Sequence, residues 1–128
     1  MSDVNDSVTV KEAIKRADDL CPNVYPFSLK ASWLYELDKR IYNDIFSRFR
    51  NPPEMSSCSY AENPDAVLLA DRDFICLYSQ HILVQCDIAS GDSEGYANHS
   101  ALFNKFYKIY TEYINRTYPH KQTRIKIS

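Results

Sequence analysis

The side chains most suited to catalysis, the histidines and cysteines, are scattered along the chain. They are His81, His99, His120, Cys21, Cys58, Cys76 and Cys86. The cysteines form no C-x-x-C pair, and no histidine follows them at zinc-finger spacing. His81 precedes Cys86 by five residues and Asp87 by six, spacings that do not place side chains together on a helix. We therefore expect free thiols and no cysteine–histidine catalytic pair.

Other catalytic or ligand-binding patterns are equally weak. Asp71, Asp73 and His81 are conceivable metal ligands, but the two aspartates are more simply the start of a helix, where the dipole favours acids. The only two glycines, Gly91 and Gly95, cannot form a dinucleotide fingerprint, and no G-x-S-x-G nucleophile motif occurs. The sequence predicts no enzyme, no cofactor and no metal.

The composition favours a single helical domain over residues 1–128. The chain is 45% hydrophobic and 25% charged, as in globular proteins, and its glycine scarcity argues against tight β-turns. Ten tyrosines suit surfaces that are buried but not dry. A net charge of −2 makes no strong case for nucleic acid. With no apolar run of about 18 residues and an acidic N-terminus, we expect no membrane span and no signal peptide.

Helical periodicity predicts an all-α bundle of about four helices. The first opens at a capping box, Thr9-Val-Lys-Glu12, and the second at Ser28 as N-cap. The third has so little polar face that we expect it in the bundle centre, and Pro119 should close the fourth. The helices are expected over about residues 9–21, 28–49, 72–89 and 94–118.

The segments outside these helices carry three further expectations. Residues 1–8 are expected to be a flexible leader before a helical core over 9–118. Residues 51–70 form a long loop between helices two and three, and Val67-Leu68-Leu69 within it is either a brief strand or a plug on the core. In the tail, residues 119–128, charged residues alternate with isoleucine, so it could pair as a short strand with a neighbour or stay loose.

Charge is strongly segregated along the chain. Residues 51–104 carry eight acids and one base, a net charge of −7, whereas residues 105–128 carry six bases and one acid, a net charge of +5. Such a molecule suits head-to-tail association between copies. The alternative is that helices three and four lie antiparallel and neutralise each other within one subunit.

An aromatic stripe on the fourth helix also has two interpretations. Its inward half would fill the core, but the stripe covers an arc wider than one buried face. The excess width indicates a second contact surface, toward another subunit. The stripe consists of Phe103, Phe106, Tyr107, Tyr110 and Tyr113.

Several segments carry a resemblance to a known family. The second helix reads W-L-x-E-L-D-x-x-I-Y from Trp33 to Tyr42, and a later Y-x-N-x-x-x-x-F-N-x-x-Y segment runs from Tyr96 to Tyr107. Over about residues 9–118 this is similar to small proteins encoded in the structural-gene block of tailed phages and of prophages in Gram-positive gut bacteria. The chain departs from that pattern at Ala97, where the family has a second asparagine.

The resemblance implies a head–tail connector, also called a head-completion or adaptor protein. Such proteins oligomerise as rings, dock beneath the portal and receive the tail or stopper protein. The chain would then be a virion component assembled in the host cytoplasm, and its basic tail could touch packaged DNA. A generic helical interaction module without enzymatic activity is the alternative. Candidate subunit or portal contacts are Asp65, Asp71, Asp73, Tyr110, Tyr113, Lys121, Arg124 and Lys126.

Overall fold

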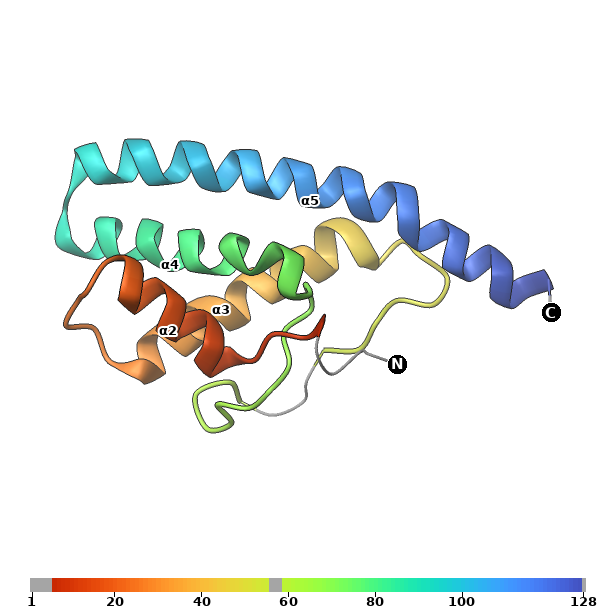
Figure 1. Cartoon of the computed structure of the whole chain (residues 1–128), viewed down its shortest axis with the longest axis horizontal. Coiled ribbons are helices and arrows are strands. Elements are labelled where there is room, and N and C mark those ends of the chain that lie inside the picture. The colour runs from red at the N-terminus through yellow and green to blue at the C-terminus, as the bar shows by residue number, and fades with distance from the viewer. Residues whose placement is uncertain (1–5, 56–58, 128) are drawn as a thin grey trace.

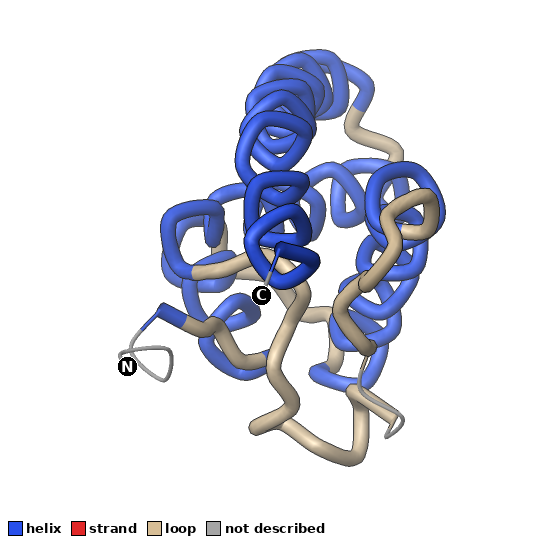
Figure 2. The backbone as a smooth tube through the Cα atoms, turned by 90° about the vertical axis from the view of Figure 1, so that its right-hand side faces the viewer, coloured by secondary structure: helices blue, strands red, loops and turns tan. Residues whose placement is uncertain are grey.

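Four α-helices pack together in a computed structural model of the chain (Figure 1). It describes residues 6–55 and 59–127, and for residues 120–127 it describes only the helical backbone. Within these residues there is no strand, as Figure 2 shows from the end of the bundle. The helices are α2 (Val10–Leu20), α3 (Phe27–Ile41), α4 (Ile75–Ser90) and α5 (Ser93–Ile127). The predicted all-α class is confirmed.

The expected capping box begins α2. The Thr9 hydroxyl accepts a hydrogen bond from the Glu12 N–H at 3.3 Å, and the Glu12 carboxylate accepts one from the Thr9 N–H at 3.0 Å. Both N–H groups would otherwise lack a partner at the helix start. The apolar face that follows is buried against the bundle.

The second helix, α3, begins one residue earlier than its expected N-cap. Phe27 opens it after extended Pro26, so Ser28 lies inside the first turn and the capping prediction was wrong. After Ile41 the helix widens into a π-helical turn, η1 (Tyr42–Phe46). This turn shifts the side-chain register while keeping Ile45 in the core.

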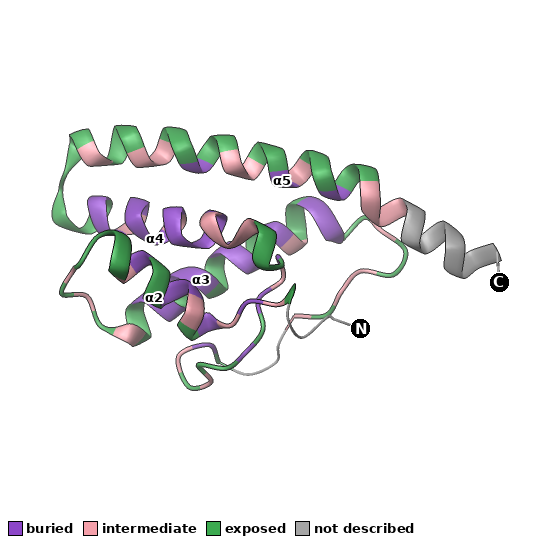
Figure 3. Cartoon of the chain, viewed as in Figure 1, coloured by how far each residue is buried: buried purple, intermediate pink, exposed green. Residues whose placement is uncertain are grey.

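The third helix, α4, lies in the middle of the bundle and contacts α2, α3 and α5. Figure 3 shows it buried along most of its length, which confirms the expectation from its apolar surface. A short 3₁₀ turn, η2 (Arg72–Phe74), leads into it. It ends at Gly91, whose φ of 75° is the left-handed conformation that glycine adopts without strain.

The long gap between α3 and α4, residues 47–71, is present as predicted, and its second half packs on the core. Ala66, Leu68 and Ala70 are buried, whereas Val67 between them is exposed. The Leu68 N–H donates to the Val8 carbonyl at 2.8 Å, and Thr9 and Val67 form an isolated antiparallel bridge. The segment is thus a plug. Val8, placed in the expected leader, is itself fully buried.

The last helix, α5, continues through Pro119 to Ile127. Both the expected helix end at Pro119 and the short C-terminal strand were therefore wrong. Proline cannot donate to the carbonyl four residues earlier and bends a helix, but residues 120–127 contain neither glycine nor a second proline to end it. Its 35 residues span about 50 Å, and Figure 1 shows the C-terminal part extending beyond the other helices.

Candidate interaction site

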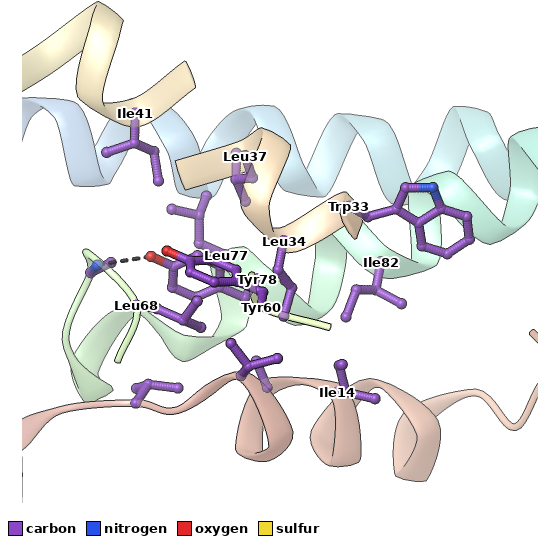
Figure 4. Close-up of a cluster of buried hydrophobic side chains, with 14 of the residues drawn as sticks. Ile14, Trp33, Leu34, Leu37, Ile41, Tyr60, Leu68, Leu77, Tyr78 and Ile82 are labelled. Atoms are coloured by element: carbon purple, nitrogen blue, oxygen red, sulfur yellow. Dashed lines mark hydrogen bonds between the residues drawn. The ribbon is translucent and has the colours of Figure 1, made fainter. Parts of the chain in front are cut away.

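A buried carboxylate, Asp38 of α3, fastens the long loop to the core. It accepts hydrogen bonds from the Tyr60 hydroxyl at 2.8 Å, the Leu69 N–H at 3.2 Å and the Tyr78 hydroxyl at 2.6 Å. The Tyr78 hydroxyl in turn accepts from the Ala70 N–H at 2.8 Å. Figure 4 shows both tyrosines inside the apolar cluster. One carboxylate therefore joins α3, α4 and two points of the loop.

The surroundings of Asp38 set its protonation. Burial raises the pKa of Asp38 from 3.8 to about 6, while the hydrogen bonds from Tyr78, Tyr60 and Leu69 oppose that rise. Burial, together with the Asp38 charge, raises the pKa of Tyr60 and of Tyr78, so both hydroxyls stay protonated donors. Because Asp38 is fully buried and both its oxygens accept hydrogen bonds, its role is to hold the loop.

Close to this network, an aromatic pocket of about 150 Å³ lies where α5 leaves the bundle. Phe74 lines it, and the Phe74 ring centroid lies 4.8 Å from that of Tyr110 and 5.2 Å from that of Tyr113. The pocket reaches from the core to the surface, since Tyr110 is 2% exposed and Tyr113 37%. The residues that line it include Leu69, Asp71, Phe74, Tyr110, Tyr113 and Tyr118.

The structure brings three of the predicted contact residues together in this aromatic pocket: Asp71, Tyr110 and Tyr113. Tyr110 is core, so it can contribute to a surface only through the floor of the pocket. Asp73 is exposed in η2 but does not line the pocket.

The other predicted contact residues lie elsewhere. Asp65 pairs with Lys11 of α2 at 3.0 Å. Lys121, Arg124 and Lys126 follow Pro119 in α5, and their side chains fall outside the part that is described.

In the described residues no lysine or arginine of α5 forms an ion pair with an acid of α4. Lys105, Lys108 and Arg116 take part in none of the ion pairs there. The lysines and arginines that do pair belong to α2, α3 and η2, and the contact between α4 and α5 in this set is that of His99 with Asp87 at 2.6 Å. Lys105, Lys108 and Arg116 are exposed.

In the described residues His81 and the candidate metal ligands Asp71 and Asp73 do not gather into one cluster. Burial, and then the charge of Arg40, lowers the pKa of His81 to about 4, although its contact with the Trp33 backbone opposes this. His81 is therefore neutral, with its ring 5.5 Å from that of Phe103, and it acts as packing. In the described residues no group of three histidine, cysteine, aspartate or glutamate side chains could hold a metal ion. The Cys58 thiol lies outside the described residues.

Two residues of this site were missed at the sequence level. Asp38 lies four residues after Leu34 and three before Ile41, so an acid on the apolar face was visible in the sequence. Phe74 had no comparable signal, because its partners on α5 lie more than 35 residues away and come together only through packing.

Comparisons with protein-family models, with curated proteins and with solved structures find no match to this chain. No helix in the described part is long and apolar enough to cross a membrane.

Proposed function

We propose that this chain is a structural protein that assembles with copies of itself, and that its assembly is the head–tail connector of a tailed phage or prophage. The observation that carries self-assembly is the separation of charge: an acidic middle segment and a basic last segment that extends beyond the bundle as helix. A subunit with opposite charges at separate places can join the next subunit head to tail, and such contacts close into rings when the rotation permits.

The phage assignment is supported by the resemblance of the Trp33–Tyr42 and Tyr96–Tyr107 segments. Within that proposal the ring docks on the portal protein and presents a surface to the tail or stopper protein. The basic end of α5 lies where it could also approach DNA phosphates in the channel.

Electron microscopy tests this proposal directly. The full chain would be imaged alone at high concentration and mixed with a portal protein from the same genome. Rings of the chain, alone or seated on the portal, are expected. A chain that forms no ring in either preparation and does not bind the portal would overturn the proposal and favour the alternative, a generic helical interaction module.

A further inference from the structure

We propose that two copies of this chain pair through α5, with the two helices antiparallel and related by a two-fold axis. The contact is made by the α5 seam, defined here as Leu102, Phe106, Ile109 and Tyr113. It goes beyond the proposed function, because a two-fold contact closes at two copies and is separate from the head-to-tail contact that builds a ring.

The α5 seam lies on a side of the helix that the rest of the described chain leaves uncovered. Among the other helices, α5 packs mainly on α4, and Figure 3 shows its side away from α4 exposed along most of its length. Leu102, Ile109 and Tyr113 are between 37% and 47% exposed, and Phe106 is half-buried. A row of large apolar side chains on such a surface is typical of a contact with another molecule.

The spacing of the α5 seam is that of a coiled coil. Its four residues follow one another at steps of four, three and four, which places them in one line along one face of the helix. Two helices with rows of this spacing pack against each other because the side chains of one row fit between those of the other. The α5 seam is therefore suited to a second helix.

Two charged residues beside the α5 seam identify that helix as α5 of a second copy. Lys105 and Glu112 lie seven residues apart, so they are on the same side of the seam. Both are exposed, and neither takes part in an ion pair within the described side chains. A face that carries an acid and a base flanking one apolar row is complementary in charge to a reversed copy of itself.

The positions of these charges also set the direction of the pair. When the two helices run antiparallel with Phe106 level with Ile109 of the second copy, Lys105 lies within two residues, about 3 Å along the axis, of Glu112 of the second copy. The two-fold axis repeats this ion pair on the other half of the contact. In a parallel pair Lys105 would instead lie opposite Tyr110, and no opposite charges would meet beside the seam.

Charge reversal in the full-length chain tests the pairing. Lys105→Glu places two glutamates together across the contact and Glu112→Lys places two lysines together. Sedimentation equilibrium at low salt should therefore show each variant pairing about tenfold more weakly than wild type. An equimolar mixture of the two variants should form one-to-one pairs as tightly as wild type, because every charge contact in the mixed pair joins a lysine to a glutamate. The chain that carries both substitutions should pair with itself for the same reason.

A second variant tests the apolar part of the contact. Ile109→Gln removes an apolar side chain from the α5 seam and should weaken pairing by about tenfold or more. The matched controls are Lys108→Glu and Ile88→Gln, which make the same kinds of change at exposed positions outside the seam, and both should pair like wild type. Circular dichroism of every variant checks that the helices are retained.

The results separate this pairing from the proposed function. The pairing is overturned if wild type stays monomeric up to about millimolar concentration, if the single reversals pair as tightly as wild type, or if their mixture stays monomeric. Each of these results leaves the proposed function standing when the chain still forms rings on the portal protein. A chain that pairs as expected but forms no ring and does not bind the portal protein supports the pairing and overturns the connector assignment.

Discussion

At the scale of single residues, Asp38 combines an unfavourable burial with three favourable hydrogen bonds. Removing a carboxylate from water disfavours its charged form, and the donors from Tyr60, Leu69 and Tyr78 compensate only in part. The sequence showed the acid on the apolar face of α3. It could not show the partners, because they come from 22 to 40 residues away and are placed by tertiary packing.

The stability of the fold should depend on pH through Asp38. Its pKa is about 6 in the folded protein against an ordinary 3.8, so the folded state binds the proton more tightly than the unfolded chain. The contribution of Asp38 to the free energy of unfolding is therefore present in full below pH 3.8 and is lost as the pH rises to about 6. This difference of about two pKa units corresponds to about 3 kcal/mol.

Urea unfolding of wild type and of Asp38→Asn between about pH 4 and pH 7 measures this contribution. The amide does not titrate, so the stability of wild type relative to the variant should fall as pH rises. A difference that stays constant over this range would show that Asp38 has no raised pKa.

At the scale of elements, the loop plug should contribute to stability through alternate residues. Leu68 is 4% exposed and Val67 is 52% exposed. Leu68→Ala leaves a cavity and should lower the free energy of unfolding by about 2–4 kcal/mol, whereas Val67→Ala should change it by less than about 0.5 kcal/mol. Chemical denaturation measures both. Equal effects would mean that the segment is not docked as the structure has it.

The turn between α4 and α5 gives a second prediction at this scale. Gly91 has a φ of 75°, so Gly91→Ala should cost about 1–2 kcal/mol, whereas Gly91→Asn should cost less because asparagine tolerates this conformation. Thermal unfolding of the two variants compares them. No Cβ contact would arise within 4 Å, so a cost equal for both variants would rule out backbone conformation as the cause.

The helices themselves were predictable, but some of their ends were not. Apolar spacing located all four, and the capping box at Thr9 was predicted correctly because it is a local signal. Pro119 misled the prediction, since a proline that usually ends a helix here lies within one. The docking of Leu68 was left open as strand or plug, because only contact with Val8 distinguishes them.

At the scale of the whole molecule, the sequence alone predicted the segregation of charge, and the structure shows where the charged residues lie in the fold. Within the described side chains no lysine or arginine of α5 forms an ion pair with an acid of residues 51–104, although His99 of α5 contacts Asp87 at 2.6 Å. The aromatic stripe of α5 has an inner and an outer part, because Tyr110 lies in the core and Tyr113 lies at the surface. The pocket between them could not be foreseen, because Phe74 and Tyr118 join it through packing.

The central claim is that copies of this chain associate through opposite charges. Sedimentation velocity of the full chain at about 50 mM and about 500 mM salt tests it most directly, since salt screens such contacts over a few ångströms at the higher concentration. The account predicts assemblies at low salt that grow with protein concentration and dissociate at high salt, with unchanged helical circular dichroism. Assemblies that salt leaves unaltered, or a protein that stays monomeric in low salt both alone and with the portal protein, would contradict it.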